Sequence, residues 1–290
     1  MMRSMYAAIS GLKVHQTMLD VTSNDIANVN TLGFKAQRTT FKDSLAQLQR
    51  GGAAPNAAQG GSNALQVGLG VQLSSIDNVM SSGALQTTGN PLDIALQGEG
   101  WFRVATGNPP ANPGAGIYNP PVPAGTVPQY SRAGNFTRNQ NGYLITQDGN
   151  YVLGRAAPGA GAAADTFINI PNGATNLGIG QDGSISFDPP APATGRVTAG
   201  YLTLAKFANE AGLERLSSNR WMASASSGGE AVGTPGNGYA LAQSGTTEMS
   251  NVDLAQEFTN MITAQRGFQA NSRVISAADQ MLQDLVNLNR

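Results

Sequence analysis

The sequence predicts an α+β fold in which discontinuous N- and C-terminal helices form a coiled-coil-like inner domain and the middle of the chain is β-rich. Three observations lead to this prediction. All 15 prolines lie between Pro55 and Pro235, and proline inside a helix costs about 3 kcal/mol. Apolar residues recur every seven positions near both ends of the chain. The middle contains short alternating runs separated by Asp-Gly and Asn-Gly pairs, which supply the positive φ angles of hairpin turns.

The N-terminal helix is predicted from a stripe of apolar side chains spaced seven residues apart. The members of this stripe are Met5, Leu12, Leu19 and Ile26. A stripe with this spacing is buried only against another helix. We expect the helix to end near residues 29–31, where Asn28, Asn30 and Gly33 tolerate left-handed backbone conformations.

The C-terminal helix carries a second sevenfold stripe. Its members are Leu254, Met261, Phe268, Ile275 and Leu282. Ser250 precedes Asp253 by three residues, which is the spacing of a capping box and predicts that Ser250 caps the helix. Residues 1–50 hold six basic and three acidic side chains, whereas residues 244–290 hold three basic and five acidic ones. The opposite charges favour pairing of the two helices, but burial of the stripes is expected to dominate.

The middle of the chain is expected to hold strands at residues 67–76, 92–104, 143–153, 177–187, 200–207 and 220–222. Asp148-Gly149 and Asp182-Gly183 separate apolar runs in two of these segments and predict hairpins. Residues 108–128 hold seven of the prolines and are expected to form a solvated loop. We therefore divide the chain into an N-terminal helix with a turn (1–50), a linker (51–64), a β-rich outer domain (65–243) and a C-terminal helix (244–290).

The composition argues against several classes of function. Only 12% of the residues are charged and the formal net charge is -1, so the attraction to phosphate on which nucleic-acid binders depend is missing. The chain has no Cys and a single histidine, His15, which argues against zinc sites and against Ser-His-Asp catalysis. No cleavable signal and no membrane-spanning apolar run is found. We expect a non-enzymatic protein without a metal, a cofactor, nucleic acid or membrane insertion.

Four segments resemble one protein family and occur in that family's order. Residues 1–42 begin MMRSMYAAISGLKVHQTMLD and contain ANVNTLGFK, and residues 250–290 begin SNVDLAQEFTNMITAQRGF. The central segments are GNPLDIALQGEGWFRV at 89–104 and YSRAGNFTRNQNGYLITQDGNYVLG at 130–154. Together they resemble the rod and hook proteins of the bacterial flagellum over a little under half of the chain.

This resemblance implies a role in assembly for particular residues. The two stripes, Met5, Leu12, Leu19, Ile26, Leu254, Met261, Phe268, Ile275 and Leu282, would form the assembly interface of a homopolymer. Asn28, Asn30, Gly33 and Phe34 would form the signature turn after the first helix. The implied partners are identical subunits, rod, hook-cap and hook–filament junction proteins, and the flagellar type III export apparatus. The implied location is the hook or basal body, outside the cell after export.

Within the family, the ending QRGFQANSRVI and LVNLNR looks most like hook protein. The first expectation is therefore a hook subunit, which self-assembles into a helical tube that transmits torque from rod to filament as a flexible joint. The alternative within the family is the distal rod subunit of the basal body. An alternative from another class is a secreted carbohydrate-binding β protein, suggested by the Gly/Asn-rich strands and the sparse charge.

Overall fold

The computed structural model describes residues 2–52, 54, 60–109, 119–123, 125–158, 165–190, 195–236 and 238–288. The chain forms two compact units. The helix unit comprises Met1–Asn28, Ala36–Val79 and Val252–Arg290, and the β unit comprises Val29–Lys35 and Met80–Asn251. With helices at both ends and a β-rich middle, the fold belongs to the predicted α+β class.

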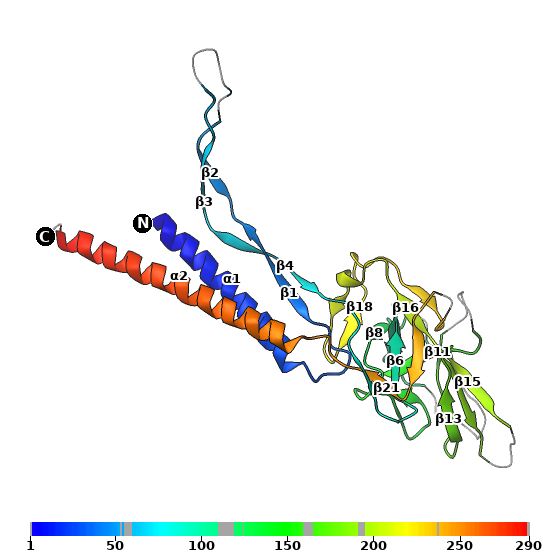
Figure 1. Ribbon diagram of the computed structural model, residues 1–290. Helices are drawn as coiled ribbons and strands as arrows, with labels where there is room; N and C mark the ends of the chain where they lie inside the picture. The colour runs from blue at the N-terminus through cyan, green and yellow to red at the C-terminus, as the bar shows by residue number, and fades with distance from the viewer. Residues whose placement is uncertain are drawn as a thin grey trace. The chain divides into compact units, whose positions relative to one another are not determined.

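Two long helices dominate the helix unit, and they run side by side in opposite directions (Figure 1). They are α1 (Met2–Ala27) and α2 (Leu254–Leu288). The residues that are buried on these helices are mostly small, and they include Ala8, Gly11, Ala264 and Ala278. Small residues let two helix backbones approach closely, so the larger stripe residues remain at the margins of the contact.

The first residues of α2 differ from the prediction. The cap is Asp253 and not Ser250, because the Asp253 carboxylate oxygen Oδ1 accepts hydrogen bonds from the backbone N–H groups of Ala255 (2.9 Å) and Gln256 (3.3 Å). An aspartate at this position satisfies two N–H groups of the first turn and suits the helix dipole. The chain is still extended at β21 (Thr246–Glu248), which precedes the cap.

A narrow β ribbon completes the helix unit, and the sequence analysis named no strand in its first half. The ribbon pairs β1 (Gln37–Asp43) with β4 (Val71–Asn78) and β2 (Ala46–Arg50) with β3 (Leu65–Gly68), all antiparallel (Figure 1). The backbone N–H of Gln37, at the start of β1, donates to Asp25 on α1 at 2.8 Å, and that of Val71, at the start of β4, donates to the Ser10 hydroxyl at 3.2 Å. Of the expected linker 51–64, residues 53 and 55–59 lie outside the described residues.

The β unit is built around one large sheet. Its central path runs in the order β13-β14-β15-β11-β7-β8-β18-β17. The elements of this unit are β5 (Leu85–Thr87), β6 (Ile94–Gln97), β7 (Trp101–Ala105), β8 (Gln129–Ser131), β9 (Thr137–Arg138), β10 (Leu144–Ile145), β11 (Tyr151–Arg155), β12 (Thr166–Phe167), β13 (Thr175–Ile179), β14 (Ser184–Asp188), β15 (Val197–Leu202), β16 (Leu204–Lys206), a 3₁₀ helix (Glu210–Gly212), β17 (Glu214–Arg215), β18 (Arg220–Met222), β19 (Ala231–Gly233), β20 (Leu241–Ser244) and β21.

Most of the predicted strands are present, and their turns explain why. Gly149 and Gly183 adopt φ angles of 83° and 75°, which glycine reaches without strain. They allow β10 to pair with β11 and β13 with β14, both antiparallel. Of the Pro-rich segment 108–128, residues 110–118 and 124 lie outside the described residues.

Aromatic and aliphatic side chains fill two main cores of the β unit. The larger core gathers side chains of β6, β7, β11, β14 and β15, and it includes Ile94, Phe102, Phe136, Leu144, Ile168, Phe187 and Leu202. The second core contains Trp101, Tyr130, Phe207, Leu213 and Trp221. Each large side chain that is fully buried contributes about 1.5–3 kcal/mol. The second core matters for the site because the chain before β1 packs beside it.

Candidate assembly surfaces and the buried anchor of the turn

The segment between α1 and β1 turns tightly at Gly33. Its backbone φ is 65°, and its N–H donates to the backbone carbonyl of Glu248 at 2.8 Å. A β-carbon at this position would lie 2.6 Å from the backbone nitrogen of Ala133. Both the left-handed conformation and the close approach require glycine here.

Phe34 follows the turn and is buried in the β unit. The Arg215 guanidinium lies over its ring, 4.4 Å from the centroid, and over the Trp221 ring at 5.1 Å. The same guanidinium donates from Nη2 to the backbone carbonyl of Lys35 at 2.7 Å. This arrangement combines a cation–π contact with a hydrogen bond and fixes the backbone of residues 34–35.

Next to Phe34, three buried charged side chains form what we call the anchor cluster: Lys35, Arg132 and Glu248. Lys35 Nζ lies 2.6 Å from Glu248 Oε1, and both side chains are fully buried. Arg132 Nη1 lies 3.4 Å from the other carboxylate oxygen. Burial lowers the pKa of Lys35, and the charge and hydrogen bond of Glu248 oppose this shift.

Backbone groups complete the coordination of the cluster. Lys35 Nζ also donates to the carbonyl of Ser81 at 2.9 Å, and the Gly83 N–H donates to Glu248 Oε1 at 3.0 Å. Arg132 Nη2 donates to the carbonyl of Gly98 at 2.9 Å. A buried ion pair gains little net stability over an apolar pair, but removing one partner is costly. The cluster therefore defines one specific arrangement of the segments that supply it.

These segments lie at the points where the chain passes between its two units. The boundaries follow residues 28, 35, 79 and 251, and the cluster draws on Lys35, Ser81, Gly83 and Glu248. Two further contacts tie the last boundary: the Asn251 N–H donates to the Phe34 carbonyl at 3.4 Å, and its side-chain Nδ2 donates to the Ser81 carbonyl at 3.0 Å. Within the β unit, the anchor cluster thus connects the segments that lie next to three of the four boundaries, those after residues 35, 79 and 251.

Lys35 is the last residue of the segment ANVNTLGFK, whereas Arg132 and Glu248 were not predicted from the sequence. Lys35 and Glu248 are 213 residues apart, and no local pattern links them. The sequence held one weak indication of this site. Glu248 is a single carboxylate in an uncharged stretch, between Thr247 and Met249, and a buried carboxylate needs a charged or hydrogen-bonding partner.

The residues predicted for the signature turn have different surroundings. Gly33 and Phe34 are buried as described above. The Asn28 side chain donates from Nδ2 to the carbonyl of Asn24 at 2.9 Å, at the end of α1. Asn30 is exposed. Their joint role as a signature turn stays a prediction.

The residues predicted for assembly lie along the margins of the helix pair. On α1, Met5, Leu12, Leu19 and Ile26 are all half-buried. On α2, Met261, Ile275 and Leu282 are half-buried, and Leu254 and Phe268 are exposed. Further large apolar side chains of α2 that are exposed include Phe258, Ile262, Val274, Met281 and Leu285. Their use in an interface stays a prediction.

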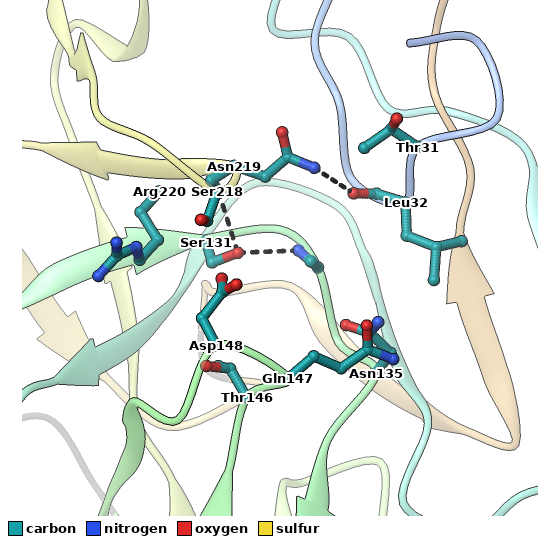
Figure 2. Close-up of a pocket in the computed structure, with 11 residues that line it drawn as sticks. Thr31, Leu32, Ser131, Asn135, Thr146, Gln147, Asp148, Ser218, Asn219 and Arg220 are labelled. Carbon is teal, nitrogen blue, oxygen red and sulfur yellow. Dashed lines mark hydrogen bonds between the residues drawn. The ribbon is translucent and has the colours of Figure 1, made fainter.

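One pocket of about 340 Å³ opens beside the turn in the β unit. Figure 2 shows the residues that line it, which come from the turn (Thr31, Leu32), β8, residues 133–135, residues 146–148 and residues 218–220. The Asn219 side chain donates to the Leu32 carbonyl at 3.0 Å, and the Ser131 hydroxyl donates to the Asn219 carbonyl at 3.2 Å (Figure 2). Most of the side chains that line the pocket carry hydroxyl or amide groups, and Asp148 and Arg220 add two charged groups. The two hydrogen bonds connect β8, the loop at residues 218–219 and the turn.

Two further findings concern the described residues only. Across these ranges, no three His, Asp or Glu side chains come together as metal ligands would. Neither of the two long helices has the hydropathy of a membrane span.

Glu210 gives a prediction for pH dependence. Burial raises the pKa of its carboxyl above the ordinary value of 4.5, and the charge of Arg132 opposes the rise. Because the folded state then binds the proton more tightly than the unfolded state, this group stabilises the fold at low pH, and its contribution is lost as pH rises through the folded pKa. Glu210→Gln should therefore reduce the loss of stability between about pH 5 and about pH 7.

The measurement is urea unfolding at the two pH values, followed by tryptophan fluorescence. Glu214→Gln, at an exposed position of β17, is the matched control and should keep the pH dependence of the parent. An unchanged pH dependence in Glu210→Gln would contradict the prediction.

Comparison with known proteins agrees with this architecture. Three family models match: the flagella basal body rod protein model at residues 5–35, the flagellar hook protein FlgE/F/G D1 domain at 114–187, and the flagellar basal body rod FlgEFG protein C-terminal model at 243–288. The flagellar basal-body rod protein FlgG of Bacillus subtilis is 44% identical over 100% of both chains.

Two relatives come from Borreliella burgdorferi. The flagellar basal-body rod protein FlgG is 31% identical over 294 residues and covers 100% of both chains. The flagellar hook protein FlgE is 27% identical in an alignment over 440 residues, which covers 99% of this chain and 100% of the hook protein. These full-length matches show that the chain belongs to the family of bacterial flagellar rod and hook proteins.

Proposed function

We propose that the chain is the distal rod subunit of the flagellar basal body, a non-enzymatic building block that polymerises into a rigid tube. The observation that carries this proposal is the 44% identity to a rod protein over the whole length of both chains. Of the two relatives from Borreliella burgdorferi, the hook protein aligns with this chain over 440 residues, whereas the rod protein aligns over 294 residues. The hook protein therefore has segments without a counterpart in this chain, which favours the rod over the hook.

Exposed apolar surface on the helix unit supports polymerisation. Phe258 and Ile262 stand four residues apart on α2 and are each about half exposed, and Val274, Met281 and Leu285 are exposed further along. These side chains lie on more than one side of α2, and exposed apolar side chains in this number are unfavourable in water unless partners cover them. In the proposed tube, helices of neighbouring subunits cover them together with the two predicted stripes, and the helix units form the inner domain.

The ribbon gives a second reason to expect neighbours. Every residue of β2 and β3 is exposed, and Leu48 and Leu65 are more than half exposed. An isolated two-stranded ribbon is marginally stable in water, and its unpaired edges favour association. We expect neighbouring subunits to cover the ribbon, which would add contacts that stiffen the tube.

The remaining implied partners follow from the same proposal. A subunit of the rod must leave the cytoplasm, and the expected route is the flagellar type III export apparatus. Rod proteins and the proteins that join the rod to the hook would then contact the chain at the two ends of the polymer. The proposed location is the basal body.

The test is electron microscopy of basal bodies from a strain that lacks this gene. A rod that stops after its proximal part supports the proposal, and complementation by the full chain should restore it. A complete rod without a hook would contradict the rod assignment and favour the hook. Deleting residues 1–30 should abolish complementation, because α1 and its stripe are lost; a carbohydrate-binding protein would instead keep its affinity after this truncation.

A further inference from the structure

Two glycines on α1 and α2 each lie against a polar side chain of the opposite helix. A β-carbon at Gly11 would lie 2.6 Å from Nδ2 of Asn271, and a β-carbon at Gly267 would lie 2.5 Å from Cε1 and Nε2 of His15. Each helix therefore presents one glycine to a polar side chain of the other. Figure 1 shows the two helices side by side along this region.

The two contacts are reciprocal and belong to one antiparallel register. His15 follows Gly11 by four residues on α1, and Gly267 precedes Asn271 by four residues on α2. Four residues are about one helical turn, so both contacts lie on the facing sides of the two helices, one turn apart.

The apolar stripes do not select this register. Met5, Leu12, Leu19 and Ile26 repeat every seven residues, as do Met261, Phe268 and Ile275 on α2. If one helix moved along the other by seven residues, each stripe residue would take the position of the next one in its stripe. The apolar area buried between the helices would then be similar. The stripes therefore tolerate several registers.

The glycine contacts distinguish between these registers. After a shift of seven residues, His15 would face Asn260 or Val274, and Asn271 would face Ser4 or Met18. All four of these residues carry a side chain where the native register has only a hydrogen atom. In each shifted pairing, the added side chain would overlap the His15 ring or the Asn271 amide, which is unfavourable in a packed interface.

We propose that the contacts Gly267–His15 and Gly11–Asn271 fix the register of the helix pair. Gly267–His15 tolerates a larger residue less well than Gly11–Asn271 does, because the Asn271 side chain can rotate away whereas Phe41 restricts the His15 ring. The ring also packs edge-on against Phe41 of β1, with 6.2 Å between centroids. Its buried Nδ1 atom has no hydrogen-bond partner among the described residues, so the fit of the ring, and not a hydrogen bond of Nδ1, holds it.

The test uses disulfide trapping, for which this chain is suited because it has no Cys. In the native register, Met18 on α1 lies level with Ala264 on α2, while Glu257 lies one heptad away, about 10 Å along the axis. A disulfide requires Cα atoms within about 7 Å. The variant M18C/A264C therefore reports the native register, and M18C/E257C reports the shifted one. Each pair is introduced into the full chain, and cross-linking is measured by mass spectrometry in isolated basal bodies.

With the contacts intact, M18C/A264C should cross-link about tenfold more than M18C/E257C. Gly267→Ala should reduce the native cross-link several-fold, although alanine is the better helix former and would otherwise strengthen the helix. Adding His15→Ala to Gly267→Ala should restore the native cross-link, because the ring that clashes is gone.

Gly267→Ala with an unchanged native cross-link would overturn the proposal, as would a double variant that does not recover. If the Gly267→Ala subunit is not incorporated into basal bodies, the single and double variants are compared by motility and by subunit incorporation instead. Recovery in His15→Ala/Gly267→Ala then supports a clash at this contact, and continued failure overturns it.

Discussion

Replacing Glu248 by alanine should lower the free energy of unfolding of the β unit by about 3–5 kcal/mol, because it leaves buried charges without a partner. Lys35 Nζ lies 2.6 Å from the carboxylate and its side chain has no exposed surface. Arg132 would also lose its partner, and the Gly83 N–H would lose its acceptor.

Urea unfolding followed by tryptophan fluorescence measures this effect well. The chain has two tryptophans, Trp101 and Trp221, and both are buried in the second core of the β unit. Glu99→Ala is the matched control, since Glu99 pairs with Lys206 at the surface and should leave the midpoint close to that of the parent.

A double variant separates the loss of the ion pair from general damage to the core. Lys35→Met combined with Glu248→Leu removes both charges and keeps apolar bulk, so it should be less destabilised than Glu248→Ala alone. A Glu248→Ala protein within about 1 kcal/mol of the parent would contradict the anchoring role of the cluster.

Replacing Gly83 by alanine should destabilise the β unit by about 3 kcal/mol, at the upper end of the range for overpacking. A β-carbon at this position would lie 2.0 Å from the carbonyl oxygen of Met249 and 3.0 Å from its carbonyl carbon. Both atoms belong to the backbone, which cannot rotate away as a side chain could. The strand before α2 would therefore have to move, together with the N–H of Gly83 that contacts Glu248.

Gly229→Ala is the matched control for this change. No atom lies within 4 Å of a β-carbon built at Gly229, so alanine there should be neutral or stabilise by about 0.4–1 kcal/mol. Equal urea midpoints for the two variants would contradict the prediction. We also expect Gly83→Ala to impair rod assembly in motility assays, because the displaced residues 249–251 lead into the cap of α2.

Several elements could be predicted because their signals are local. The Pro-free ends, the sevenfold stripes and the Asp-Gly turns are each patterns of residues that are close in the sequence, and they led to the α+β class and to strands such as Ser184–Asp188. The prediction of a cap at Ser250 was wrong: two candidate caps stand three residues apart, and the helix begins only after Asp253, whose carboxylate accepts hydrogen bonds from the N–H groups of the first turn.

The ribbon was missed for a related reason. The segment 37–50 has polar and apolar residues without strong alternation, and its strands are stabilised by pairing with residues 65–78 and by contacts of β1 and β4 with α1. Neither influence appears in a local window of the sequence.

By itself, the sequence determined the α+β class, the family, and the two helical ends with their repeating stripes, since periodicity and signature segments are properties of neighbouring residues. Only the tertiary structure decided which charges are buried together, which small residues the helices share, and where the chain passes between its units. The physical reason is distance along the chain: the pairs Lys35–Glu248 and His15–Gly267 each join residues more than two hundred positions apart. Their free energy depends on burial and close fit, which exist only after folding.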